Sequence, residues 1–293
     1  MFSQQLINAV SLGSVYALFA LGFTLIFGVL GVINLAHGAV FMLGSYIALL
    51  LVEQFSLPIL PALLLAMVVS GLFAVLIDLL VLRPLRARNA PHLAPMIATI
   101  GVAILVTNIM QGLLGAEVKR FPVGTLPDES LGFGDLHITA LQIGIVVISL
   151  LLMAGLWVMM KRTQLGRSLR AIAESPKAAA LLGIPVESLF YFTSFLAGAL
   201  GGAAGVLVGL SFNAISPFMG QPMLHKGIAV IILGGMGDIR GALIGGIFLG
   251  FAEVFSVAYI SSDFRDAVAF GFLFLILLIK PSGLFGKILE RKA

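Results

Sequence analysis

The polar residues best suited to chemistry in this apolar chain lie between residues 28 and 46, in the stretch GVLGVINLAHGAVFMLGSY. His37 could act as a base and Ser45 as a nucleophile, because nucleophilic catalysis needs a base within hydrogen-bond reach of the hydroxyl. The two residues are eight positions apart, however, and the sequence places no other base beside them. We therefore predict no catalytic residues, and an enzyme is the weaker alternative.

A metal site is also disfavoured by the spacing of the possible ligands. The other histidines, His92, His137 and His225, belong to distant segments, and no acidic residue lies close to His37. Cysteine is absent, so neither a thiolate site nor a disulfide can form. We predict no metal and no cofactor.

The chain also lacks a phosphate-binding loop. Such loops read G-x-x-x-x-G-K-[ST], because the backbone cradles phosphates and the hydroxyl binds magnesium. The GLFGK stretch at residues 283–287 has a shorter spacing, and Ile288 follows Lys287. We therefore expect any ATP hydrolysis to reside in other proteins.

The composition indicates that these residues are held by apolar helices in a membrane. Hydrophobic residues make up 60% of the 293 positions and charged residues only 10%, whereas soluble domains carry roughly 25% charged residues. The net charge of +4 does not indicate nucleic-acid binding, because the basic residues occupy a few short loops. The predicted class is an all-α polytopic membrane protein.

Apolar runs that could cross a membrane recur along the whole chain. A crossing helix needs about 20 apolar residues, and two runs, 39–52 and 224–236, are too short to cross unless they extend into their polar flanks. We predict eight to ten transmembrane or half-membrane helices in one transmembrane domain spanning residues 1–293. The nine runs are 5–28, 39–52, 59–82, 96–114, 140–160, 189–211, 224–236, 240–260 and 267–279.

The basic residues predict the orientation, because lysine and arginine accumulate in short cytoplasmic loops. Thirteen of the 17 basic residues lie in regions that alternating spans place on one side, whereas Lys119, Arg120 and Arg265 fall on the other. The N-terminus is expected outside. The predicted cytoplasmic segments are 161–188 and 281–293, and the predicted outer segments are 115–139 and 261–266.

Small residues recur at four-residue spacing in several runs, which lets helix backbones approach closely in lipid. Tight packing is one interpretation, and sliding of the same faces during gating is the other. The positions are Gly13 and Ala17, the series Gly201, Gly205 and Gly209, and the pairs Gly241 with Gly245 and Gly246 with Gly250.

Two polar breaks interrupt the apolar runs. Asn34 and His37 share a face if the helix continues, but Gly28, Gly31 and Gly38 favour a break. Irregular backbone at membrane depth must be buried in protein or line a cavity, so this break is either a structural turn or part of a transport path. We expect His37 to be neutral and buried in either case.

The second break, in residues 226–246, has glycines that permit a tight turn, and the run 96–114 carries a polar stripe that could form hydrogen bonds between helices. The candidate pathway or helix-break residues in both breaks and in the stripe are Asn34, His37, Gly38, Thr107, Asn108, Gln111, Gly234 and Gly235.

Residues 161–188 form the longest basic loop and carry strong helix signals. Arg170 and Glu174 are spaced for an i, i+4 pair. Ser175 can cap a short helix over 176–182 that begins with Pro176 and ends before Gly183. Its apolar face would comprise Ala178, Ala179, Leu181 and Leu182. Such a helix in a surface loop suggests docking, either on another protein or on the chain's own membrane domain.

Three stretches give the chain a resemblance to a known family. GVINLAHGAVFMLGSY, RSLRAIAESPKAAALLGIPV and KGIAVIILGGMGDIRGALIGG are similar, in order and spacing, to motifs of the first permease subunit of branched-chain amino acid ABC importers. The resemblance covers nearly the full length and implies a multi-pass protein of the bacterial cytoplasmic (inner) membrane. It also implies that the coupling segment docks on an ATPase through Glu174, Ser175, Pro176, Lys177, Ala178, Ala179, Leu181, Leu182 and Gly183.

The resemblance further implies which partners the chain has. These are a homologous second permease, two cytoplasmic ATP-binding subunits, a soluble periplasmic or extracellular substrate-binding protein and membrane lipid, without nucleic acid. The sequence leaves open whether the cargo is a branched-chain amino acid, an amide or urea. A secondary transporter or channel without an ATPase partner remains the alternative.

Overall fold

The computed structural model describes residues 2–91, 93–122, 130–133, 136–280 and 283–285. His92 and most of the tail predicted to be cytoplasmic, 281–293, lie outside the described residues.

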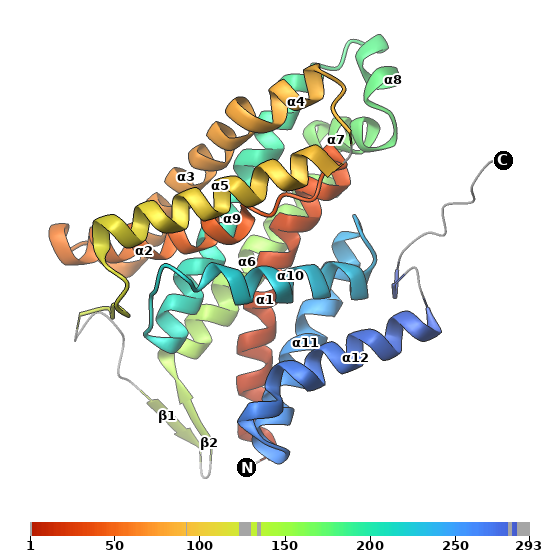
Figure 1. Ribbon diagram of the computed structural model, residues 1–293. Helices are drawn as coiled ribbons and strands as arrows, with labels where there is room; N and C mark the ends of the chain where they lie inside the picture. The colour runs from red at the N-terminus through yellow and green to blue at the C-terminus, as the bar shows by residue number, and fades with distance from the viewer. Residues whose placement is uncertain (1, 92, 123–129, 134–135, 281–282, 286–293) are drawn as a thin grey trace.

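Each of the nine predicted apolar runs corresponds to one long helix of the described chain, which confirms the all-α class (Figure 1). The short run 39–52 extends into its polar flank, because its helix begins at His37 and covers 19 residues. The helices are α1 (Phe2–Leu30), α2 (His37–Phe55), α3 (Ile59–Ile77), α5 (Leu93–Leu114), α6 (Ala140–Arg162), α9 (Val186–Phe212), α10 (Gly220–Gly234), α11 (Ile239–Tyr259) and α12 (Arg265–Ile279).

Seven helices of the described chain are long and apolar enough to cross a membrane. Helices α10 and α12 have only 15 residues each, which gives a length of about 22 Å against a hydrocarbon layer of about 30 Å. These two helices therefore need neighbouring segments to complete a crossing.

Shorter elements cap the two ends of the bundle. A π-helical turn η1 (Asp78–Leu82) and α4 (Arg83–Ala87) continue α3, and α7 (Gln164–Glu174) and α8 (Pro176–Leu181) follow α6. An antiparallel hairpin, β1 (Ser130–Phe133) and β2 (Leu136–Thr139), pairs Ser130 with Thr139, and a single 3₁₀ turn η2 (Ser262–Phe264) precedes α12. The sequence analysis did not predict the hairpin.

Helix α1 is the centre of the bundle and is almost entirely buried. It meets α11 at small residues, since a Cβ on Gly13 would lie 2.8 Å from the Ile247 Cα and a Cβ on Gly246 would overlap the backbone of Ala17. Helices α2 and α9 meet in the same way, because a Cβ on Gly205 would overlap the Phe41 carbonyl. The small residues at four-residue spacing therefore lie at close helix contacts, in agreement with the packing interpretation.

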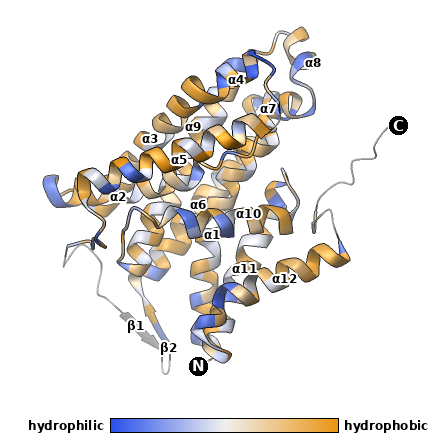
Figure 2. Cartoon of the chain, viewed as in Figure 1, coloured by the Kyte–Doolittle hydropathy of each residue, from blue (hydrophilic) through white to orange (hydrophobic). Residues whose placement is uncertain are grey.

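Helices α3, α5 and α12 consist largely of hydrophobic residues (Figure 2). Leu64, Leu113 and Phe274 are each more than 60% exposed. Such surfaces are suited to lipid or to another apolar protein, because soluble monomers rarely expose large contiguous apolar patches.

Successive helices connect at alternating ends of the bundle. Segment 31–36, α4, α7, α8 and the turn at 235–238 lie at one end, whereas the hairpin and the chain start lie at the other (Figure 1). Close contacts agree with this arrangement: Gln4 exchanges hydrogen bonds with the His137 backbone, and the backbones of Lys119 and Ile215 pair.

This alternation generates a test of orientation. We predict that cysteines introduced at Ser168 in α7 and at Ser262 in η2 react with membrane-impermeant maleimide from opposite sides, with Ser168 reactive from the cytoplasm. The measurement compares labelling in intact cells and in inverted vesicles. The unmodified chain is the control because it has no cysteine. Labelling of both positions from one side would contradict the orientation.

Candidate functional site

A cavity of about 680 Å³ lies between α2, α5 and α10. Its wall is mainly apolar, with polar groups contributed by Thr107, Asn108, Gln221 and His225. Of the candidate pathway residues, the fold brings Gly38, Thr107 and Asn108 to this cavity, and the other five are not part of its wall. The wall residues are Ile33, Leu35, Gly38, Ala39, Met42, Met96, Ile100, Ala103, Ile104, Thr107, Asn108, Pro217, Phe218, Gly220, Gln221, Leu224, His225 and Ile228.

The first predicted break is present, with Asn34 buried and with Ile33 and Leu35 in the cavity wall. Helix α1 ends at Leu30 and Gly31 follows with a φ of 68°, a conformation that favours glycine. The Asn34 side chain accepts a hydrogen bond from the Ala36 N–H at 3.1 Å, and the Leu35 N–H donates to Thr99 Oγ1 at 3.1 Å. Asn34 therefore satisfies freed backbone as expected, whereas sequence analysis missed Thr99.

Gly38 is not part of this turn, contrary to the expectation that it supplies backbone freedom. It lies in the first turn of α2, where a Cβ would lie 2.6 Å from the Gly220 carbonyl oxygen of α10. Its lack of a side chain therefore allows α2 and α10 to meet beside the cavity.

His37 is buried as predicted, with 1% of its surface exposed. Its Nε2 lies 3.3 Å from the Phe19 carbonyl oxygen, and its ring packs 4.7 Å from the Phe19 ring centroid. A Cβ on Gly201 would lie 2.7 Å from its Cε1. The buried Ser45 hydroxyl has no hydrogen-bond partner within the described part of the chain. The two residues therefore do not form a nucleophile and base, and His37 anchors α2 against α1 and α9.

Helix α5 contacts the bundle along a narrow face. Val106 and Met110 are buried, whereas Ile97 and Leu105 are more than half exposed. The Asn108 Nδ2 donates to the Ile104 carbonyl of its own helix at 2.8 Å rather than to a neighbouring helix. The expected hydrogen bonding between helices is therefore absent at Asn108, whose side chain contributes to the cavity wall instead.

The second predicted break forms a tight turn between α10 and α11. Gly235 and Gly237 have φ values of 101° and 87°, and the Asp238 side chain accepts from the Arg240 and Gly241 N–H groups. Gly234 serves packing rather than the turn, because a Cβ there would overlap the Gly241 backbone.

The basic segment 161–188 contains two capped helices. Ser175 Oγ accepts from the Ala178 N–H at 3.2 Å at the start of α8. At the other end Gly183 has a φ of 81°, and the N–H groups of Gly183 and Ile184 donate to the carbonyls of Ala180 and Ala179. This is the Schellman ending of a helix, so the predicted capping is confirmed.

The apolar residues of α8 divide between two sides. Ala179 is buried against the chain's own core, whereas Leu181 and Leu182 are 90% and 79% exposed. The prediction of one apolar face is therefore wrong for Ala179. The expected Arg170–Glu174 pair is also not formed, since Arg170 Nη1 donates to the Met160 carbonyl. Helix α8 projects from the α4 and α7 end of the bundle (Figure 1).

A buried ion pair lies directly beneath this end. Asp78 is fully buried, with its Oδ1 2.6 Å from Arg86 Nη1 and its Oδ2 3.2 Å from the Ser194 hydroxyl. Arg86 Nη2 also lies 3.5 Å from Glu187 Oε2, and its guanidinium packs over the Phe190 ring. Arg86 thereby ties α4 to the first turns of α9. The acid near the end of an apolar run was the available sequence signal.

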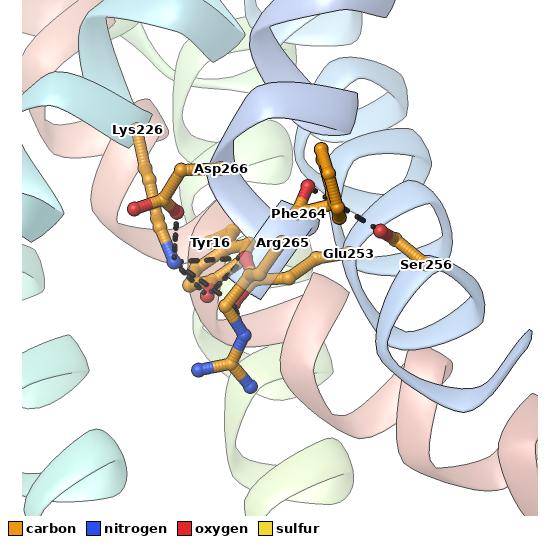
Figure 3. Close-up of polar contacts among 7 residues, drawn as sticks. All are labelled: Tyr16, Lys226, Glu253, Ser256, Phe264, Arg265 and Asp266. Carbon is orange, nitrogen blue, oxygen red and sulfur yellow. Dashed lines mark hydrogen bonds and ion pairs between the residues drawn. The ribbon is translucent and has the colours of Figure 1, made fainter. Parts of the chain in front are cut away.

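A second buried carboxylate, Glu253 of α11, lies at the opposite end (Figure 3). Its oxygens lie 2.7 Å from the Tyr16 hydroxyl, 2.8 and 2.9 Å from Lys226 Nζ, and 2.8 Å from Arg265 Nε. Asp266 Oδ1 lies 3.6 Å from Lys226 Nζ. Four helices, α1, α10, α11 and α12, therefore meet at one carboxylate. Glu253 lies inside the apolar run 240–260, whereas its partners are distant along the chain and no local pattern points to them.

The profile of a protein family described as "Branched-chain amino acid transport system / permease component" matches residues 5–278 of the chain. The chain is 37% identical over 299 residues to the high-affinity branched-chain amino acid transport system permease protein BraD of Pseudomonas aeruginosa, with 98% of this chain and 96% of the relative covered. It is 34% identical over 297 residues to LivH of Escherichia coli, with the same coverage.

An archaeal relative is also similar. The probable branched-chain amino acid transport permease protein LivH of Methanocaldococcus jannaschii is 32% identical over 300 residues, covering 95% of this chain and 91% of the relative. Among solved structures, PsaBC from Streptococcus pneumoniae aligns with a TM-score of 0.55 over 97% of this chain and 93% of that one. Its sequence identity of 14% supports similarity of fold alone.

The contact around His37 generates a stability test. We predict that Gly201→Ala destabilises the detergent-solubilised protein by about 1–3 kcal/mol because the new methyl group collides with the imidazole. In a His37→Ala background the same change should cost much less, giving a positive coupling in a double-mutant cycle. Thermal unfolding of the four proteins measures this coupling.

The matched control is Gly101→Ala in α5, where no atom lies within 4 Å of the added Cβ. It should be neutral or slightly stabilising, as glycine-to-alanine changes are in exposed helices. An equal loss from Gly201→Ala in both backgrounds would show that His37 does not limit the space.

Proposed function

Because the chain belongs to the family of branched-chain amino acid transport permeases, we propose that it is one of two homologous permease subunits of an importer driven by separate ATP-binding subunits. The chain is a multi-pass inner-membrane transport permease and not an enzyme. The proposed cargo is a branched-chain or related apolar amino acid, because the relatives are branched-chain amino acid transport permeases.

The observation that carries this proposal is the exposed leucine pair of α8. Leu181 and Leu182 project from a helix that is capped at both ends, and the helix is anchored by the buried Ala179. Burying one leucine side chain contributes about 1.5–3 kcal/mol, so a protein groove that accepts both would gain substantial binding energy. We propose that this groove belongs to a cytoplasmic ATP-binding subunit, with one such subunit for each permease.

Residues around the pair set the geometry of the proposed contact. Ser175 and Pro176 start the helix, and Gly183 ends it in a conformation that other residues rarely adopt. Lys177 and Ala178 are exposed on the same short helix and would border the groove. Glu174 ends α7 next to the cap and is exposed as well.

Movement of α8 could reach the cavity through α9. Only Leu182, Gly183, Ile184 and Pro185 separate α8 from α9, and the start of α9 is held to α4 through the Arg86–Glu187 contact. Helix α9 packs closely on α2, which forms part of the cavity wall. This continuous chain of contacts supports a mechanism in which ATP-driven displacement of α8 alternates access to the cavity.

The cavity between α2, α5 and α10 is the proposed substrate path. Its volume of about 680 Å³ and its largely apolar wall suit a small apolar amino acid. The exposed flank of α5 offers a surface that a second, homologous permease could cover. A soluble substrate-binding protein would deliver the cargo at the end that carries the hairpin.

The docking proposal predicts that the apolar character of α8 matters more than its charge. Leu181→Asp should weaken capture of the ATP-binding subunit at least about tenfold, because it removes the buried leucine contribution and adds an unpaired charge. Gly183→Val should have a similar effect through strain at positive φ. Pull-down of the subunit with membrane-inserted permease measures both changes.

Lys177→Ala is the matched control, because exposed ion pairs are worth only about 0–1 kcal/mol; it should retain binding and substrate-stimulated ATP hydrolysis. Normal capture and normal coupling with Leu181→Asp would contradict docking at α8, and the search would move to residues 83–95.

The path proposal predicts that filling the cavity blocks uptake without disturbing assembly. Ala103→Phe adds a ring to the α5 wall and should reduce ATP-dependent uptake at least about tenfold. Ala103→Ser changes little volume and should retain most of it. Uptake in vesicles, together with capture of the ATP-binding subunit, measures both. Normal uptake by Ala103→Phe would place the path elsewhere.

A further inference from the structure

Helix α10 forms one wall of the proposed path and meets three neighbouring helices closely at glycines. Gly220 meets Gly38 of α2, Gly227 meets the Phe19 ring of α1, and Gly234 meets Gly241 of α11, each too closely to admit a Cβ. These contacts contain no side-chain hydrogen bond. They therefore hold α10 in one position along its neighbours less firmly than hydrogen bonds or ion pairs would.

Empty space lies on both faces of α10. The residues Leu224, His225 and Ile228 face the cavity of about 680 Å³. On the other face, Met223 and Lys226 border a second cavity of about 350 Å³. The helix is short and is followed by the glycine turn at 235–237. It therefore has room to shift as a unit.

Lys226 provides a directional side-chain attachment near the middle of the helix, away from the backbone hydrogen bonds that Leu284 and Phe285 donate to Leu233 and Gly234 at its C-terminal end. Among the described residues, Lys226 is the one residue of α10 whose side chain forms hydrogen bonds. All of its partners belong to other helices. Its ammonium group contacts both oxygens of Glu253 and the Tyr16 hydroxyl, and it is only 12% exposed. Figure 3 shows these groups converging from α1, α10, α11 and α12.

Glu253 lies on the stationary side of this attachment. It projects from α11, which packs on the central helix α1 through Gly246 and Gly250, and it is completely buried. Tyr16 of α1 donates to it at 2.7 Å, and Arg265 contacts it from α12. The carboxylate is therefore fixed by the core, whereas its lysine partner belongs to the helix that has room to move.

We propose that Lys226 and Glu253 are positioning residues for transport, and that their ion pair holds α10 in a position that limits access to the cavity from the hairpin side. Opening of the cavity to that side then requires the Lys226–Glu253 contact to rearrange. The assignment of the cavity as the substrate path rests on the proposed function, but the effect of the pair on access to the cavity does not.

A purely structural role makes a different prediction. Replacing a buried ion pair by apolar residues of similar volume is often neutral or stabilising. Lys226→Met combined with Glu253→Leu should therefore preserve folding and access if the pair only fills space. If the pair positions α10, the same double variant should fold and yet change access to the cavity.

The experiment uses Leu224→Cys in the otherwise cysteine-free chain as a reporter of the cavity wall. The rate of modification by a membrane-impermeant methanethiosulfonate added from outside is measured in intact cells, with and without Lys226→Met/Glu253→Leu. We expect the double variant to react at least about tenfold faster. In vesicles with the ATP-binding subunits, it should also hydrolyse ATP with less substrate transported per ATP.

Lys226→Gln/Glu253→Gln is a second double variant, which retains hydrogen bonding without charge. Its modification rate should lie between that of the wild-type pair and that of Lys226→Met/Glu253→Leu. Arg120→Met is the matched control, because it removes an exposed cation at the same end and should leave the rate unchanged. A wild-type rate in both double variants would overturn the proposal. Because labelling requires no ATP-binding subunit, failure of wild-type uptake would count against the proposed function alone.

Discussion

Backbone contact at glycine is the constraint on which this architecture depends. In lipid, water does not drive apolar helices together, so association depends on how closely two backbones approach. Gly13 and Gly246 allow α1 and α11 to touch, and Gly205 allows α9 to lie on the Phe41 carbonyl of α2. A Cβ at these positions would meet backbone rather than flexible side chain, so a larger residue would force the helices apart. The enclosure of α1 and the place of α2 beside the cavity both follow from these contacts.

Buried charge complements these contacts by fixing the helix ends. A charged side chain at membrane depth costs about 2.5–3.5 kcal/mol on insertion scales, and each fully buried carboxylate of the described bundle is compensated by basic and hydroxyl partners. Asp78 is held by Arg86 and Ser194 at one end, and Glu253 by Tyr16 and Lys226 at the other. In both cases the partners come from other helices or from a later turn. The middle of the bundle is thus set by shape and its ends by charge.

Local signals predicted the elements well, whereas contacts between distant segments could not be read from the sequence. The apolar runs gave nine helices, and Ser175 and Gly183 correctly predicted the caps of α8, because spans and caps depend on neighbouring residues. Which face a helix buries was less accessible, since helices that are apolar all round carry no directional pattern. Nothing local pairs Thr99 with the Leu35 N–H, and nothing local separates the buried Ala179 from the exposed leucines. The cavity likewise depends on how α2, α5 and α10 approach one another.

The π-helical turn at Asp78–Leu82 changes the direction in which the side chains after it point around the helix axis. In an uninterrupted α-helix, residues eight apart differ by about 80° in direction, which would turn Arg86 away from Asp78. The extra residue of a π turn offsets this rotation by about 100° and leaves a difference of only about 20°. The two side chains therefore point the same way and form their 2.6 Å contact. The side-chain positions of α4 are therefore shifted by one residue relative to a regular continuation of α3. Loss of a single position within this turn would be absorbed by a return to regular α-helix, because residues seven apart differ by only about 20° in direction, whereas insertion of one further residue would turn Arg86 away from Asp78.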